Sequence, residues 1–237
     1  MNVLLTGARR GIGAATLDHL RAAGHRVVGH STAGRDGLIA ADFTDPAAPR
    51  ALWDAALAEL GSIDVLVNNA GVFEAIADDA SDAQWHAAWA RTLTINLQAS
   101  ADLSRLALAH FRNAGGKGSG GGRIVNVASR AAYRGDSPQH WHYAASKAGM
   151  IAMTKSIARG YAAENIFAFA VCPGFTMTGM AADYLSSRGG EKLLADIPLG
   201  RVADASEIAE TIRWLATDAP PSATGAVIDV NGASYVR

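Results

Sequence analysis

Short apolar runs that favour β-strands alternate with longer helical patterns from one end of the 237-residue chain to the other. The predicted strands are residues 3–5, 26–30, 38–41, 65–67, 123–128, 166–171 and 226–230. The predicted helices are residues 13–23, 47–60, 82–88, 92–111, 143–163 and 205–216. This alternation is typical of βαβ units, in which helices cover both faces of a parallel sheet. We therefore predict an α/β fold with a doubly wound, seven-stranded parallel sheet.

Local signals mark where some of these elements begin and end. Ser81 with Gln84, and Asp204 with Glu207, have the spacing of a capping box at a helix N-terminus. The glycine-rich run at residues 115–122 lies between a predicted helix and a predicted strand. Because the alternation continues across this run, we interpret it as a loop within one domain that covers residues 1–237.

Composition limits the partners that such a chain can have. The 21 Lys and Arg nearly balance the 22 Asp and Glu, giving a net charge of -1 without a strongly basic block, so nucleic acid is not an expected partner. No apolar run reaches the roughly 18 residues of a bilayer span, and the first residues lack a basic signal region, so no membrane partner is expected. The single cysteine, Cys172, adjoins an apolar strand. A buried thiol of this kind fits a reducing, cytoplasmic location.

The first glycine cluster follows the first predicted strand directly and opens the first predicted helix. It reads Thr6-Gly7-Ala8-Arg9-Arg10-Gly11-Ile12-Gly13. Glycines at such a junction let the chain turn tightly and let backbone N–H groups approach a pyrophosphate at the helix N-terminus. A flexible strand-to-helix turn with no ligand would carry the same glycines, so the cluster alone leaves both interpretations open.

The spacing Thr-Gly-x-x-x-Gly-x-Gly resembles the short-chain dehydrogenase/reductase family, and further landmarks of that family follow in order. They are Asn68-Asn69-Ala70-Gly71, Asn96, Ser129, Tyr143-Ala144-Ala145-Ser146-Lys147 and Pro173-Gly174-Phe175-Thr176-Met177-Thr178. The resemblance covers nearly the whole chain. It implies a single Rossmann-type domain that binds a nicotinamide nucleotide and transfers a hydride to or from a carbonyl or secondary alcohol.

Tyr143 and Lys147 also stand out by their spacing, because residues at i and i+4 share one helical face and the ammonium can lie near the phenol. A free phenol has a pKa of about 10, and a nearby cation would lower that pKa and assist proton exchange near neutral pH. The resemblance implies that Tyr143 is the acid or base, Ser129 bonds the substrate oxygen, Lys147 holds the nicotinamide ribose, and Asn96 supports a water relay. From the residues alone, Ser129 is equally a hydroxyl that caps a turn, and Asn96 a side chain that bonds the backbone at a helix kink.

The end of the second strand indicates which nucleotide is preferred. Relatives that use NAD usually place an acid there, whereas this chain has Ser31 and Thr32. These hydroxyls accept a 2'-phosphate without charge repulsion, and nearby arginines can neutralise it. We therefore predict NADP (NADPH), with NAD as the alternative. The arginines concerned are Arg9, Arg10 and Arg35.

The predicted cofactor site collects residues that end strands or begin the segments after them. Within it, Asp42 resembles the family's adenine-contacting acid. The full set is Thr6, Gly7, Arg9, Arg10, Gly11, Ile12, Gly13, Ser31, Thr32, Asp42, Phe43, Asn69, Ala70, Gly71, Tyr143, Lys147, Pro173, Gly174, Thr176 and Thr178.

The substrate is expected to lie between the loop at 130–142 and a substrate loop at about 175–200. Their aromatic and apolar residues suit an apolar or aromatic carbonyl compound, or equally a contact between subunits. They are Tyr133, Trp141, Phe175, Met177 and Tyr184. His140 and His142 are expected to be loop or rim residues and not metal ligands, because no third ligand is suggested.

The predicted function is an NADP(H)-dependent oxidoreductase that acts on a small-molecule carbonyl or alcohol. Two alternatives stay open: a 3-oxoacyl-thioester (acyl carrier protein) reductase, and a nucleotide-sensing protein without turnover. The resemblance further implies a homo-oligomer, a tetramer or dimer, packed through the helices at 92–111 and 143–163.

Overall fold

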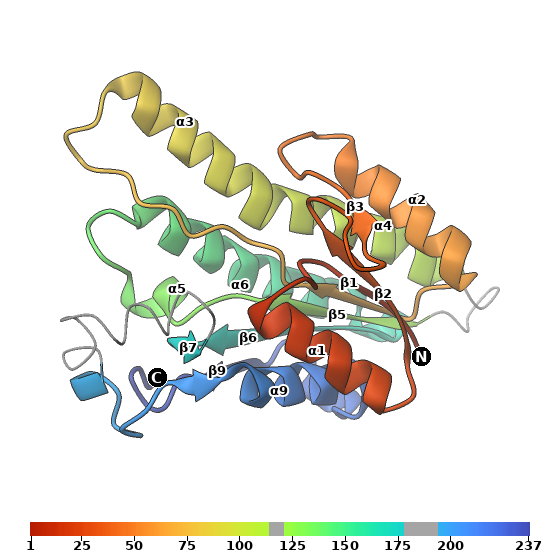
Figure 1. Cartoon of the computed structure of the whole chain (residues 1–237). Helices are drawn as coiled ribbons and strands as arrows, with labels where there is room; N and C mark the ends of the chain where they lie inside the picture. Colours follow the sequence, from red (N-terminus) through yellow and green to blue (C-terminus); the bar gives the residue numbers. More distant parts are fainter. Residues whose placement is uncertain (114–120, 178–193) are drawn as a thin grey trace.

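The computed structural model describes residues 1–113, 121–177 and 194–237. Seven parallel strands form one sheet in this part of the chain, in the order β3-β2-β1-β4-β5-β6-β9 (Figure 1). Their bounds are β1 (Asn2–Leu5), β2 (Arg26–Ser31), β3 (Ile39–Ala40), β4 (Val65–Asn68), β5 (Gly122–Val127), β6 (Ile166–Pro173) and β9 (Val227–Val230). The prediction of a seven-stranded parallel sheet is confirmed.

Helices lie on both faces of the sheet, as predicted. On one face lie α2 (Ala48–Leu60), α4 (Ala99–Asn113) and α6 (Trp141–Tyr161), and on the other lie α1 (Gly11–Ala22) and α9 (Ala205–Thr217). Successive strand residues point to opposite faces. Leu4 and Leu66 therefore pack with the first group of helices, and Leu5 and Val67 with the second. This division explains why the strands are apolar along their whole length.

Two predicted helices prove to be parts of one longer helical segment. It consists of α3 (Asp82–Leu93), a π-helical turn η1 (Thr94–Gln98) and α4. The capping box is confirmed at the start of α3, where the Gln84 backbone N–H donates to Ser81 Oγ (3.4 Å) and the Ser81 N–H donates to Gln84 Oε1 (3.2 Å). At the start of α9, the Asp204 N–H donates to Glu207 Oε2 (2.8 Å).

Several short elements were not predicted. They are α5 (Ala131–Arg134), the two-stranded pair β7 (Thr176–Met177) and β8 (Ala203–Asp204), and the 3-10 turns η2 (Ala162–Glu164) and η3 (Pro221–Ala223). Most of the glycine run at 115–122, and Thr178 and Tyr184 of the predicted substrate loop, lie outside the described residues.

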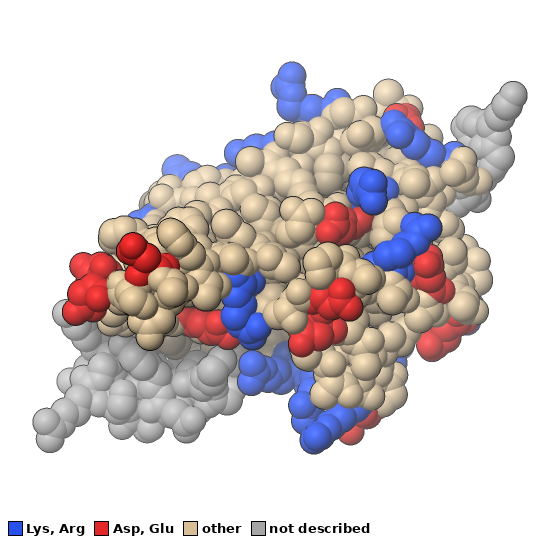
Figure 2. All heavy atoms as spheres, turned by 90° about the horizontal axis from the view of Figure 1, so that it is seen from above, with Lys and Arg blue, Asp and Glu red and all other residues tan. Residues whose placement is uncertain are grey.

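The surface seen in Figure 2 carries acidic and basic side chains side by side, without one continuous basic area. Within residues 1–113, 121–177 and 194–237, no helix is both long enough and apolar enough to cross a membrane.

The strand order reverses direction between β1 and β4, because β2 and β3 lie to one side of β1 while β5 and β6 lie beyond β4. In open α/β sheets, ligands bind beyond the carboxyl ends of the strands at such a reversal. The segments that follow β1 and β4 contain the glycine turn and the Asn-Asn-Ala-Gly motif. The fold thus places both motifs at one crevice.

Candidate active site

The glycine turn after β1 is held by the segment that follows β4. Thr6 Oγ1 accepts hydrogen bonds from the backbone N–H groups of Asn69 (2.9 Å) and Ala70 (3.0 Å). In return, Asn69 Nδ2 donates to the carbonyl oxygens of Thr6 and Gly7, both at 3.0 Å. A turn fixed by four hydrogen bonds is not an ordinary flexible connection.

Two glycines of the turn are required by close packing. A Cβ on Gly13 would lie 2.0 Å from the Gly7 carbonyl oxygen, and a Cβ on Gly7 would lie 2.8 Å from Ala70 Cα. Gly7 also has φ +66°, which favours glycine. The N-cap residue of α1, Arg10, makes no side-chain capping bond. The first N–H groups of α1 therefore remain available to an anion, and this arrangement fits the pyrophosphate of a dinucleotide.

Tyr143 and Lys147 lie one turn apart near the start of α6. Lys147 is buried, and its Nζ donates to the Val127 carbonyl oxygen (2.8 Å) and lies 5.8 Å from the centroid of the Tyr143 ring. Burial lowers the pKa of Lys147 to about 8. Burial also raises the pKa of Tyr143 to about 12, against the opposing effect of a hydrogen bond with Ser129. This shift is opposite to the lowering expected from the spacing, because desolvation of the buried phenol outweighs the hydrogen bond with Ser129.

Asn96 lies in the π-helical turn η1 and is completely buried. Its Nδ2 donates to the Val72 carbonyl oxygen (3.0 Å), and its Oδ1 accepts from the Val72 N–H (2.8 Å). Nδ2 also lies 3.2 Å from Ser146 Oγ on α6. The predicted bonding to backbone at a helix kink is thus confirmed, and the water relay stays a prediction.

Ser129 follows β5 and faces the start of α6. Its Oγ accepts the backbone N–H of Ala131 (3.1 Å), which is the predicted capping of a turn, and it also interacts with the Tyr143 phenol. On the opposite side, a Cβ on Gly71 would lie 3.3 Å from Asn96 Oδ1 and 3.5 Å from Lys147 Nζ. The structure therefore brings the four predicted catalytic residues together beyond the carboxyl ends of β4 and β5.

The predicted cofactor residues near the adenosine end differ in accessibility. Thr32, Arg9 and Arg10 are exposed, whereas Ser31 is buried and its Oγ accepts the Gly34 N–H (3.1 Å). Asp42 is exposed, and hydrogen bonds from Thr44 lower the pKa of its carboxyl group. Ser31 is therefore less accessible to a bound phosphate than the sequence suggested.

The predicted segment after β6 is described as far as Met177. The Gly174 N–H donates to the Val230 carbonyl oxygen (2.9 Å), and a Cβ on Gly174 would lie 2.7 Å from Asn231 Cα. Thr176 Oγ1 donates to the Gly174 carbonyl oxygen (3.1 Å). This segment therefore begins against the end of β9.

An aromatic pair that the sequence analysis missed lies beside the phenol. Phe73 is 53% exposed and stacks on His140, with ring centroids 3.9 Å apart. The Phe73 ring also meets the Tyr143 ring edge to face at 4.8 Å. Its only sequence signal was an aromatic residue two positions after the Asn-Asn-Ala-Gly motif.

The other aromatic candidates occupy different environments. Trp141 is exposed and meets Trp85 edge to face at 5.4 Å, whereas Tyr133 stacks on Tyr235 and accepts a hydrogen bond from Arg237 (3.0 Å). His142 is completely buried, so the expectation of a loop or rim position is wrong for it, because α6 begins at Trp141, two residues before the predicted start, and includes this residue.

The remaining candidates for chemistry near the site are the Cys172 thiol and possible metal ligands. The Cys172 thiol is buried, as predicted, and burial raises its pKa to about 12, so it stays protonated. Among the residues that the structure describes, no three His, Cys, Asp or Glu side chains are grouped to hold a metal ion.

Comparisons with known proteins find similar sequences and similar folds along nearly the whole chain. The sequence model of the family described as enoyl-(acyl carrier protein) reductase matches residues 7–233. The 3-oxoacyl-(acyl-carrier-protein) reductase of Escherichia coli is 33% identical over 98% of this chain and 96% of the relative. The cis-4-hydroxycyclohexanecarboxylate dehydrogenase of Sinomonas cyclohexanicum is 38% identical over 97% of this chain and 94% of the relative. The structure of a 3-ketoacyl-(acyl-carrier-protein) reductase from Brucella melitensis, complexed with NADH, superposes with a TM-score of 0.86 at 27% identity, covering 99% of this chain and 98% of that one.

Proposed function

Since this chain belongs to the short-chain dehydrogenase/reductase family, a family of nicotinamide-dependent oxidoreductases of carbonyl and alcohol groups, we propose that Tyr143, Ser129, Lys147 and Asn96 carry out its reaction. Residues 1–237 would form one dinucleotide-binding and catalytic domain. The single observation that carries the proposal is that Asn96 Oδ1 and Lys147 Nζ both lie within 3.5 Å of the Cβ position on Gly71, and that Lys147 lies on the helix that also holds Tyr143.

The bound nicotinamide supplies or accepts the hydride at C4. In the direction of reduction, the Ser129 hydroxyl donates a hydrogen bond to the substrate carbonyl oxygen and so orients it. Tyr143 Oη gives its proton to that oxygen as negative charge develops there. The Lys147 ammonium, fixed by Val127, then stabilises the negative charge left on the phenol.

The raised pKa of Tyr143 suits this direction, because a phenol with a pKa of about 12 carries its proton at neutral pH and can act as the acid. A nucleotide-sensing protein without turnover would not need all four side chains in contact range. Their placement therefore supports an enzyme over that alternative.

We propose NADP over NAD as the nucleotide. No acidic side chain ends β2, and Thr32, which follows β2, and Arg9 and Arg10, which follow β1, are exposed. The buried Ser31 adds less support than the sequence suggested. The NADH bound to the Brucella relative keeps NAD as the alternative.

For the substrate, we propose a small cyclic or apolar carbonyl compound. The exposed face of Phe73 beside the phenol offers a flat apolar contact, which suits a ring substituent next to the carbonyl. The cyclohexane ring in the name of the Sinomonas relative is consistent with this choice. The carrier-protein reductases among the relatives favour the second candidate, a 3-oxoacyl thioester.

One experiment tests these proposals together. A panel of cyclic ketones, aliphatic aldehydes and acetoacetyl-CoA is offered with NADPH and, separately, with NADH, and the loss of nucleotide absorbance is followed. We expect faster turnover with NADPH and a higher kcat/KM for cyclic ketones. Preference for acetoacetyl-CoA would establish the second candidate, and absence of turnover with every member would contradict the enzyme proposal.

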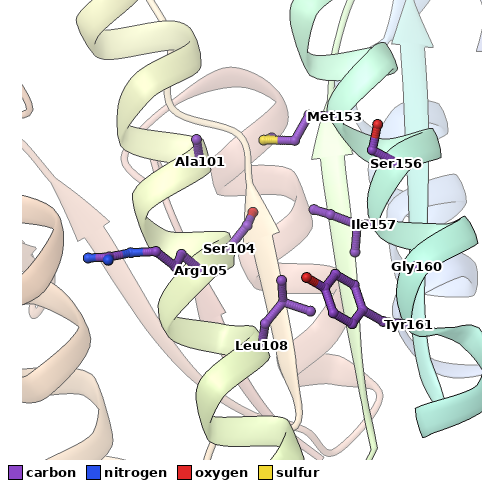
Figure 3. A pocket seen from close by; sticks show the side chains of 9 residues that line it. All are labelled: Ala101, Ser104, Arg105, Leu108, Met153, Ser156, Ile157, Gly160 and Tyr161. Carbon is purple, nitrogen blue, oxygen red and sulfur yellow. The ribbon is translucent and has the colours of Figure 1, made fainter.

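We also propose a homo-oligomer, a dimer or homotetramer, in the cytoplasm. A groove of about 400 Å³ lies between α4 and α6, and the side chains that line it are mixed apolar and polar (Figure 3). They include Leu108, Met153, Ile157 and Tyr161. Helix faces of this kind suit packing against a second copy of the chain. Light scattering tests the proposal, and a monomer at micromolar concentration would overturn it.

A further inference from the structure

His30 connects the glycine turn to the segment that follows β3. Its side chain lies near the end of β2 and is 2% exposed. Nδ1 lies 3.2 Å from the Gly7 backbone nitrogen, which donates to it, and Nε2 lies 2.8 Å from the Ala41 carbonyl oxygen. The His30 carbonyl oxygen also accepts the Ala8 N–H (2.8 Å). Two consecutive residues of the turn are therefore hydrogen-bonded to this one histidine.

The hydrogen bonds of the ring require one protonation state. The neutral tautomer with hydrogen on Nε2 donates to Ala41 and accepts from Gly7. A protonated imidazole carries hydrogen on both nitrogens and has no acceptor left for the Gly7 N–H. Protonation of His30 would thus turn a hydrogen bond into a contact between two donors.

The ring also holds the adenosine side of the predicted site. It stacks on Phe43, with ring centroids 4.5 Å apart and an angle of 24° between the planes. Phe43 follows Asp42, which the family resemblance places against the adenine. His30 thus contacts the phosphate side through Gly7 and the adenine side through Ala41 and Phe43.

The electrostatic surroundings favour the neutral ring. Burial lowers the pKa of His30 below its ordinary value of 6.5, and the bond to Ala41 opposes that shift in part. The charged side chains on the three segments that touch the ring are all exposed. They are Arg9, Arg10, Arg35, Asp36, Asp42 and Asp45.

We propose that His30 is a positioning residue for the dinucleotide, and that its neutral ring sets the glycine turn at the correct distance from the adenine-contacting segment. The inference rests on the proposed function, because it assumes that this crevice binds a dinucleotide. His30 touches neither the reacting atoms nor the catalytic side chains. Its loss should therefore change nucleotide binding and leave the chemical step intact.

Two substitutions separate positioning from simple packing. His30→Phe keeps an aromatic ring against Phe43 and removes both hydrogen bonds, whereas His30→Gln retains one acceptor and one donor and cannot be protonated near neutral pH. His86→Gln is the matched control, because His86 is exposed on α3. Nucleotide Kd is measured by fluorescence titration with NADPH and with NADH, and KM and kcat by initial rates.

At pH 7.5 we expect His30→Phe to raise the nucleotide Kd and KM about tenfold, while kcat at saturating nucleotide changes less than about twofold. His30→Gln should restore Kd to within about threefold of the wild type. If His30→Phe does not fold, the wild type and His30→Gln still test the proposal through their pH profiles. The wild-type Kd should rise as the pH falls below 6.5, and that of His30→Gln should rise less.

The nucleotide's own 2'-phosphate also titrates near pH 6, and comparison with NADH and with His86→Gln removes that contribution. Equal pH profiles for the wild type and His30→Gln, or an unchanged Kd in a folded His30→Phe, would overturn the positioning role while leaving the proposed function in place. If the wild type binds neither dinucleotide, the proposed function is wrong and the inference fails with it.

Discussion

Lys147 donates a hydrogen bond of 2.8 Å from Nζ to the carbonyl oxygen of Val127, the last residue of β5. This bond fixes the ammonium to the sheet at 5.8 Å from the centroid of the Tyr143 ring. The cation can stabilise negative charge at the phenol without forming an ion pair with it in this structure. The acid and the cation are therefore separately held, and each can be tested separately.

Replacement of Tyr143 by Phe should abolish proton transfer and leave the nucleotide site intact. We expect kcat to fall at least about a hundredfold, the size typical of lost general acid catalysis, with nucleotide Kd changed less than about threefold. Rates of NADPH oxidation and a fluorescence titration measure the two quantities. Tyr161→Phe, on the same helix, is the control and should keep full activity. Full activity in Tyr143→Phe would remove Tyr143 from the mechanism.

Carbonyl reduction should decline as the pH rises through the pKa of Lys147. Burial lowers that pKa to about 8, so the Lys147 side chain carries its positive charge below this pH and loses its proton above it. Because the pKa of Tyr143 is raised to about 12, the phenol keeps its proton throughout the same range. We expect kcat/KM for reduction to fall about tenfold per pH unit above 8, measured by initial rates in a constant-ionic-strength buffer.

The variant Lys147→Arg tests whether the decline above pH 8 comes from deprotonation of Lys147, since a guanidinium stays charged at all accessible pH values. It should retain less activity than the wild type at pH 7, because the bond to Val127 is altered. Its activity should not decline near pH 8. A decline at the same pH in both proteins would assign the titration to another group.

The features of the site that can be predicted from the sequence are those determined by residues close together in the chain. The glycines at 7 and 13 are needed wherever a helix packs this closely on a turn, and the spacing of Tyr143 and Lys147 is a helical period. The π-helical turn at Asn96 has no such signature, because the helical period before and after it is nearly the same. Contacts made by distant segments, such as Phe73 on His140, and the burial that raises the pKa of Tyr143, arise only in the folded chain.

Alanine at Gly13 should destabilise the protein and weaken nucleotide binding. Its Cβ would lie 2.0 Å from the Gly7 carbonyl oxygen, so the turn must shift away from α1. We expect the free energy of unfolding to fall by about 1 to 3 kcal/mol, measured by urea denaturation. Gly160→Ala is the matched control, because its added Cβ would meet no atom within 4 Å among the described residues outside the backbone of its own helix, and it should raise stability by about 1 kcal/mol. Equal stability of Gly13→Ala and wild type would show that the turn is not tightly packed.

Removal of the Arg10 guanidinium should weaken the binding of NADPH and leave the binding of NADH nearly unchanged. Arg10 is exposed in the glycine turn, where a 2'-phosphate would gain a charge-assisted hydrogen bond from it. In Arg10→Ala we expect NADPH to bind about tenfold more weakly and NADH to bind within about twofold of the wild type, by fluorescence titration. Arg50→Ala, which removes an exposed arginine on α2, should change neither affinity. An equal loss for both nucleotides would place Arg10 at the pyrophosphate instead.

Alanine at Phe73 should affect the substrate and not the nucleotide. The Phe73 ring lies 4.8 Å from the Tyr143 ring and 3.9 Å from the His140 ring, and half of its surface is open to an incoming molecule. Loss of an aromatic contact of this kind should raise KM for a cyclic ketone about tenfold. Thermal stability should change little, because the side chain is 53% exposed. Val236→Ala, another exposed apolar side chain, is the control. Measurement of KM for both a cyclic ketone and acetoacetyl-CoA then decides whether Phe73 selects the ring, since a role limited to holding His140 would raise both values equally.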